Sequence, residues 1–170
     1  LDTPARLPSA KARAWRIDVA DDDSLGKLLA LAAKLGAWTQ VAATLEEGAA
    51  AAPHADLAGE LWARVAEIHE AHRGDLPRAI AAWRKVQDLR PDDTMPLAAL
   101  DRLLARTNRI DELVIVVARR ADLTEDSGVR LVLLHRVAAL YEEALTGRPA
   151  AITAYKNVLD AFLPASLRTL

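Results

Sequence analysis

Residues 61–91 read LWARVAEIHEAHRGDLPRAIAAWRKVQDLRP, and this stretch decides the fold. In its first half, apolar residues recur at spacings of three and four, as at Leu61, Val65 and Ile68, and the same spacing returns in its second half. A glycine and a proline interrupt the pattern at 73–77. The stretch therefore predicts two amphipathic helices joined by a turn. Because a lone hairpin cannot cover both apolar stripes, we expect further hairpins stacked beside it.

The composition favours an all-α protein and excludes several classes of function. Aromatic residues make up only 4% of the 170 residues, and alanine, leucine, arginine and glutamate dominate. The absence of cysteine excludes disulfides, zinc–thiolate sites and thiol nucleophiles. A formal charge of −2 gives no general attraction for nucleic acid. No apolar run approaches the ~20 residues that span a bilayer, so we expect neither nucleic-acid binding nor membrane insertion.

No signal peptide opens the chain, so the cytoplasm is the default expected location, with the periplasm as the alternative if a signal has been removed. The chain begins at Leu1 without a methionine and stops soon after a predicted helix, so we expect a fragment of a longer protein. The alanine- and arginine-rich usage is typical of a GC-rich bacterial source.

Capping acids, glycines and prolines divide the chain into four helical hairpins. We expect a repeat domain over 24–164, preceded by a loop that could hold part of a helix (1–23, with the helix at 10–19) and followed by a tail (165–170). The predicted hairpins cover 24–53, 57–91, 94–123 and 129–163. Outside the central stretch, the expected helices lie at about 25–35, 39–51, 97–105, 110–121, 129–145 and 150–161.

The chain also matches itself. A shift of 72 residues without a gap places Leu61 on Leu133, and Ala66 on Ala138. The same shift pairs further residues along the whole chain: Asp21 with Asp93, Leu25 with Leu97, Leu28 with Leu100, Leu31 with Leu103, Val65 with Val137, Glu70 with Glu142, Pro77 with Pro149 and Ile80 with Ile152. The period covers two hairpins of about 36 residues, which is the signature of a helical solenoid.

The hairpin resembles the tetratricopeptide repeat (TPR), which has small residues where helices pack closely, aromatic residues between them and a proline after the second helix. The residues at its signature positions are Trp62, Val65, Ala66, His69, Ala79, Trp83, Val86 and Pro91, and in the fourth hairpin Leu134, Val137, Ala138, Tyr141, Ala151, Tyr155 and Val158. In the first and third hairpins Leu29 and Asp101 replace the small residue of the first helix. The resemblance implies a right-handed α-α superhelix of about four hairpins.

In TPR arrays, the first helices of successive hairpins line a concave groove that binds peptides. By this resemblance, the candidate partner-binding residues are Lys34, Glu67, Glu70, Arg102, Arg106, His135 and Glu142. The lysine and asparagine set with which some TPR domains clamp a terminal carboxylate is absent. Pairing of Glu67 and Glu70 with Arg102 and Arg106 across adjacent hairpins is the structural alternative to a role in partner binding.

Catalytic and metal-binding signals are weak. His69 and His72 lie three apart on a helix, a spacing that can hold a metal, but no third ligand accompanies them, and His69 falls where the resemblance expects a buried tyrosine. The sequence contains no HExxH motif, no phosphate-binding glycine loop and no Gly-x-Ser-x-Gly. We therefore expect no catalytic residue, metal or cofactor.

Ile110–Val117 is the most apolar stretch of the chain, and its apolar residues cover more than one stripe of the predicted helix. We favour burial of this helix between hairpins, with self-association through it as the alternative. The sequence as a whole predicts a non-catalytic scaffold that binds a protein or peptide partner. The alternative function is a structural, self-assembling or spacer module of a larger protein.

Overall fold

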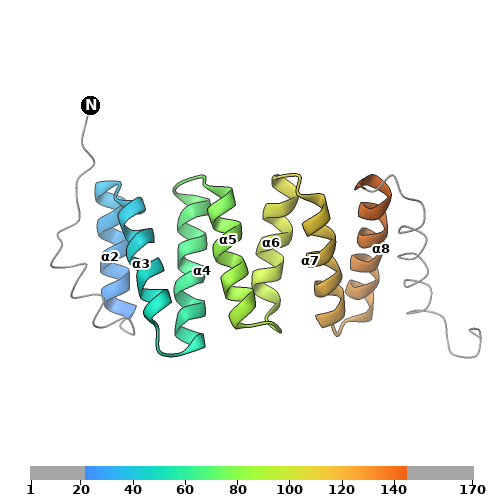
Figure 1. Ribbon diagram of the computed structural model, residues 1–170, viewed down its shortest axis with the longest axis horizontal. Helices are drawn as coiled ribbons and strands as arrows, with labels where there is room; N and C mark the ends of the chain where they lie inside the picture. Colours follow the sequence, from blue (N-terminus) through green and yellow to red (C-terminus); the bar gives the residue numbers. More distant parts are fainter. Residues whose placement is uncertain (1–21, 145–170) are drawn as a thin grey trace, which may run out of the picture. The chain divides into compact units, whose positions relative to one another are not determined.

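A computed structural model describes residues 22–144, which form an all-α array of seven helices within that range (Figure 1). Their bounds are α2 (Asp22–Leu35), α3 (Trp38–Ala51), α4 (Ala55–Ala71), α5 (Leu76–Leu89), α6 (Thr94–Arg106), α7 (Ile110–Leu123) and α8 (Ser127–Ala144). Each helix covers a segment for which the apolar periodicity predicted one. The largest difference is at α4, which begins before the quoted stretch because residues 55–60 include the helix formers alanine, leucine and glutamate. The predicted segments 10–19, 150–161 and 165–170 lie outside the described residues.

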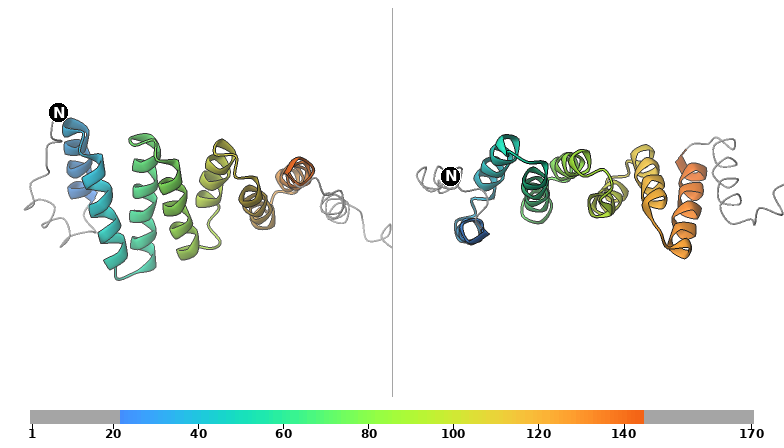
Figure 2. Two further views of the ribbon diagram at one scale, coloured as in Figure 1. Left: turned by 45° about the horizontal axis from the view of Figure 1, so that its top comes forward. Right: turned by 90° about the horizontal axis from the view of Figure 1, so that it is seen from below.

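Contacts divide the chain into two compact units, Leu1–Pro91 and Asp92–Leu170. In the first unit, α2 packs against α3, α3 against α4, and α4 against α5, and in the second unit α7 packs against both α6 and α8. Within each unit, successive helices lie side by side and are joined at alternate ends (Figures 1 and 2). The boundary between the units falls between the second and third predicted hairpins, so each unit holds one copy of the 72-residue period.

Equivalent positions of the two copies occupy equivalent places in the two cores. Leu61 and Leu133 are 2% and 6% exposed, and the small residues Ala66 and Ala138 are both fully buried. Small residues at these positions allow neighbouring helices to approach closely. The self-match in the sequence thus reflects a repeated core.

The repeat extends to backbone conformation in the turns. Gly36 begins the α2–α3 turn with φ of 64°, and Asn108, which is 72 residues later, has φ of 53° in the α6–α7 turn. Gly74 in the α4–α5 turn has φ of 62°. Glycine and asparagine are the residues that adopt this left-handed conformation most readily after a helix. The two copies therefore use different residues for the same turn geometry.

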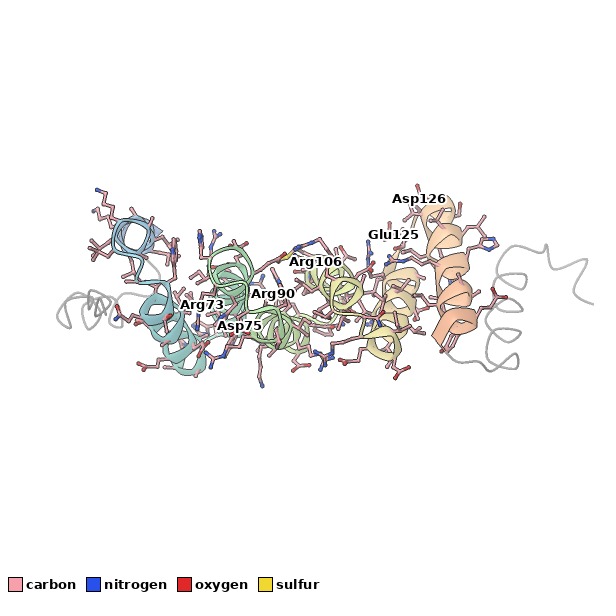
Figure 3. The ribbon with its side chains drawn as sticks, turned by 90° about the horizontal axis from the view of Figure 1, so that it is seen from above. Arg73, Asp75, Arg90, Arg106, Glu125 and Asp126 are labelled. Carbon is pink, nitrogen blue, oxygen red and sulfur yellow. The ribbon has the colours of Figure 1, made fainter. Side chains whose placement is uncertain are left out.

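Three aspartates cap helices, and one of them, Asp93, belongs to an acidic run that was predicted to do so. Asp75 accepts a hydrogen bond from the Arg78 backbone N–H (3.2 Å), and Asp93 accepts one from that of Met95 (2.9 Å). Asp126, at the loop that enters α8, accepts one from the Val129 N–H at 2.8 Å (Figure 3). Each cap satisfies a backbone donor that has no partner inside its helix.

Arg90 fastens the end of α5 to the beginning of α4 (Figure 3). Its Nη2 donates a hydrogen bond of 2.6 Å to the Asp56 carbonyl, and its Nε lies 3.8 Å from the Asp56 carboxylate. The side chain passes over Gly59, where a Cβ would lie only 2.9 Å from Arg90 Nε. A side chain at position 59 would therefore displace Arg90 from this position.

We expect Gly59→Ala to give little or no stabilisation, because the ~1 kcal/mol of helix propensity that it gains is opposed by displacement of Arg90. In an Arg90→Ala background the same change should raise the free energy of unfolding by about 1 kcal/mol. Gly26→Ala is the matched control, since nothing lies within 4 Å of its Cβ position. Urea denaturation followed by tryptophan fluorescence measures the free energy of unfolding of all three variants, because the four tryptophans lie before residue 92 and so report on the first unit. Equal gains at both glycines in the wild-type background would contradict this account.

Candidate partner-binding site

The predicted partner-binding residues are distributed over four alternate helices. Six are exposed and Glu70 is half-buried. In the first unit, Lys34 lies in the last turn of α2 while Glu67 and Glu70 lie on α4. In the second unit, Arg102 and Arg106 lie on α6, and His135 and Glu142 lie on α8. Spacings of three, four and seven place each pair on one face of its helix.

Glu67 has a partner within its own helix. Its carboxylate lies 2.9 Å from Arg64 Nη1, and both side chains are about half exposed. An exposed pair of this kind contributes little stability, typically ~0.3–0.5 kcal/mol. Arg102 and Arg106 belong to the other unit, so the pairing of Glu67 and Glu70 with them stays a prediction.

A buried carboxylate joins α6, α7 and α8, the helices described in the second unit. The Asp101 side chain on α6 is 5% exposed and accepts hydrogen bonds from Arg120 on α7 and Arg136 on α8. The Arg136 bond is bidentate, with Nη1 at 2.7 Å from Oδ2 and Nη2 at 2.6 Å from Oδ1. The two arginines are 28% and 40% exposed, so their outer N–H groups reach solvent. We call these residues the Asp101 cluster.

The Asp101 cluster places two positive guanidinium groups around one negative carboxylate. Both carboxylate oxygens of Asp101 have arginine partners. Paired guanidinium groups are what a buried carboxylate requires, because an unpaired one would be costly. The cluster therefore has a structural role in holding α6, α7 and α8 together. From the sequence, Asp101 is only a departure from the repeat pattern, and its two arginine partners were not predicted. The acid within the leucine-rich stripe of α6 was the available signal for a buried carboxylate.

Two valines on the outer surface of α8 were also missed. Val129 is 49% exposed and Val132 is 66% exposed. With His135, Ala139 and Glu142 they recur at spacings of three and four residues, and so they share one side of the helix. We call these five residues the α8 face. Two of the predicted site residues are thus part of a surface that also contains exposed apolar side chains.

His69 and His72 make two different contacts in the first unit. His69 is fully buried, as the resemblance predicted for this position, and its Nε2 lies 3.1 Å from the Glu46 carboxylate. Its Nδ1 is buried without a hydrogen-bond partner. The His72 ring stacks on Trp38, with ring centroids 3.6 Å apart and planes 2° from parallel. Both imidazoles therefore contact α3, through different residues of it, and Glu46 is a residue that sequence reasoning did not connect with them.

Burial is confirmed for four of the six apolar residues of Ile110–Val117. Leu113, Val114, Val116 and Val117 are buried in α7. Ile110 is half-buried, and Ile115 is 69% exposed. Its exposure leaves one large apolar side chain on this helix for a contact with another molecule.

Among residues 22–144, no helix is long and apolar enough to cross a membrane, and no group of three or more histidine, aspartate or glutamate side chains could hold a metal ion.

No family model matches the chain, and no curated protein is significantly similar to it. The likeness to TPR hairpins consequently depends on the residues of the chain itself, and above all on the repeated period.

Proposed function

We propose that the chain is a non-catalytic protein-interaction scaffold, a TPR-like solenoid that binds a peptide or protein partner along the exposed faces of α2, α4, α6 and α8. In this proposal the hairpins continue over 24–164 and form a right-handed superhelix. The groove that they line is the predicted binding site.

The observation that carries the proposal is the agreement between the 72-residue period and the two packed units. Repeated helical hairpins bury a core only between neighbours, so every first helix keeps one exposed side. On these sides small residues alternate with charged ones: Ala30 precedes Lys34, Ala98 precedes Arg102, and Ala139 precedes Glu142. Such a surface suits recognition of an extended partner, because small side chains leave room for it and charges select it.

Affinity capture from a lysate of the source organism tests the proposal. The wild-type chain is compared with a variant in which Glu67, Glu70, Arg102 and Arg106 are reversed in charge. We expect one partner that the wild-type chain retains and the variant loses. The control reverses Lys85 and Asp88, which are exposed on α5, a second helix of a hairpin. Far-UV circular dichroism checks that all three proteins are equally helical. Equal capture by all three, or loss in the control as well, would contradict a site on the first helices.

A self-assembling or spacer module is the second proposal, and the exposed Ile115 on α7 is the observation that favours it. Exposed apolar side chains of this size are common at contacts between subunits. Sedimentation velocity over a range of concentrations separates the two proposals. A dimer that dissociates in Ile115→Glu supports self-assembly, whereas a monomer at all concentrations removes it.

A further inference from the structure

The Asp101 cluster holds more positive charge than its buried carboxylate requires. Arg136 alone forms a bidentate pair with Asp101, which neutralises the carboxylate and engages both of its oxygens. Arg120 adds a second guanidinium group. Gly48 occupies the position of Arg120 in the other copy of the repeat, so the packing of a hairpin does not by itself require an arginine there. The second arginine is thus in excess of what burial of the acid demands.

The outer sides of both guanidinium groups are available to a ligand. Among residues 22–144, Asp101 is the only acid that pairs with Arg120 or Arg136, and neither arginine has an acid three or four residues away on its own helix. Each guanidinium group has more N–H donors than its contacts with Asp101 use, and both side chains are partly exposed. Pairing with Asp101 therefore occupies one edge of each group and leaves other donors open.

Small residues lie beside the cluster on both helices that flank α7. Ala98 and Ala105 are exposed on α6, one turn before and one turn after Asp101. Ala139 of the α8 face is also exposed and lies one turn after Arg136. Side chains of this size leave room for a group of another molecule to reach the guanidinium N–H groups.

The other copy of the repeat shows which group the α8 arginine lacks. Arg64 of α4 is equivalent to Arg136, and its guanidinium lies 2.9 Å from the carboxylate of Glu67. Ala139 occupies the position of Glu67 in the second copy. The first copy thus supplies a carboxylate to the exposed side of this arginine from its own helix, whereas the second copy has an alanine there.

We propose that the outer N–H groups of Arg120 and Arg136 bind a carboxylate from an aspartate or glutamate side chain of the partner. This inference rests on the proposed function and names the chemical group that this part of the site recognises. Asp101 holds the two guanidinium groups in place, so less conformational freedom is lost when a ligand binds. A carboxylate matches the excess of one positive charge, whereas a phosphate group, with nearly two negative charges, would exceed it.

Selection from a random peptide display library against the whole chain supplies a probe without a known partner. We expect the enriched peptides to share an aspartate or glutamate. Fluorescence polarisation then compares the best peptide, amidated at its C-terminus so that only side chains carry carboxylates, with a version in which the shared acid becomes its amide. This replacement should weaken binding to the wild-type chain at least about tenfold.

The same comparison in Arg136→Lys locates the effect. Lysine keeps the positive charge beside Asp101 but lacks the planar fork that binds a carboxylate through two N–H groups, so the amide replacement should weaken binding to this variant by less than about threefold. Arg64→Lys is the matched control, because it changes the equivalent arginine of the other copy, which already pairs with Glu67. It should respond as the wild-type chain does.

A triple variant separates recognition from the stability of the cluster. Asp101→Leu combined with Arg120→Met and Arg136→Met removes all three charges and keeps apolar side chains of similar volume, so the chain should fold, which far-UV circular dichroism checks. This variant should bind the acidic peptide and its amide version equally. Enrichment of peptides that share no acid, an equal effect of the amide replacement in the wild-type chain and the triple variant, or tighter binding of a phosphoserine version would overturn the inference.

Lysate capture distinguishes failure of this inference from failure of the proposed function, because the charge-reversal variant leaves the Asp101 cluster unchanged. We expect the triple variant to lose the captured partner. If it retains the partner while the charge-reversal variant loses it, the carboxylate site is overturned and the proposed function stands.

Discussion

Asp101→Ala should lower the free energy of unfolding of the second unit by about 2–3 kcal/mol, which is less than the ~3–5 kcal/mol typical of removing one partner of a fully buried ion pair. The substitution removes three charge-assisted contacts and leaves Arg120 and Arg136 facing each other without the carboxylate between them. The loss is smaller than for a fully buried pair because both guanidinium groups remain partly solvated. Denaturation followed by far-UV circular dichroism measures it. Tryptophan fluorescence follows the first unit alone and should shift less.

Two variants show whether this loss comes from the ionic cluster. Asp122→Ala removes an exposed aspartate near the end of α7 and should change the stability by less than about 0.5 kcal/mol. Replacement of the whole Asp101 cluster by leucine and two methionines should restore most of the stability, because apolar residues of similar volume often substitute for a buried ion pair. Leu29 occupies the position of Asp101 in the other copy. If Asp101→Ala proves as mild as Asp122→Ala, the cluster contributes no more than a surface pair.

The helices and turns could be predicted because their signals are local. Apolar spacing, Asp93 as a cap and Gly74 as a turn residue each act within a few residues of the chain, so a single sequence reveals them. The pairing of Asp101 with Arg136 spans 35 residues and depends on which faces of α6 and α8 meet at α7. No local pattern contains that information. The contact between Glu46 and His69, 23 residues apart, was missed for the same reason.

The candidate site was predicted only in part, because exposure depends on packing as well as on residue type. The resemblance to TPR hairpins placed charged residues such as Arg102 on a face open to a partner, and Arg102 is exposed. Valine is a residue type common in protein cores, so the apolar sequence of this helix by itself predicts that Val132 is buried. Its exposure becomes visible only once α7 is seen to cover the opposite side of α8. An exposed apolar residue is thus the kind of site that sequence patterns conceal.

Leu103→Ala should lower the free energy of unfolding by about 3 kcal/mol, while Leu31→Ala should lower it by only about 1 kcal/mol. The two leucines are 72 residues apart and equivalent in the repeat, but Leu103 is fully buried in α6 whereas Leu31 is half-buried in α2. Removal of a fully buried side chain leaves a cavity and forfeits its packing contacts, and removal of a half-buried one allows water to fill the space. Far-UV circular dichroism measures the first variant, and tryptophan fluorescence measures the second.

This pair of substitutions tests whether equivalent positions of the repeat contribute equally to stability or whether the burial of each side chain decides its contribution. If the two copies were energetically equivalent, the equivalent leucines would contribute equally to stability. The two decreases in the free energy of unfolding would then agree within about 0.5 kcal/mol. A difference of about 2 kcal/mol would instead mean that burial, which differs between the copies, sets the contribution of each repeat. Equal losses would require that Leu31 become buried in solution, and they would contradict the half-exposed surface of α2 on which the placement of Lys34 in the binding site depends.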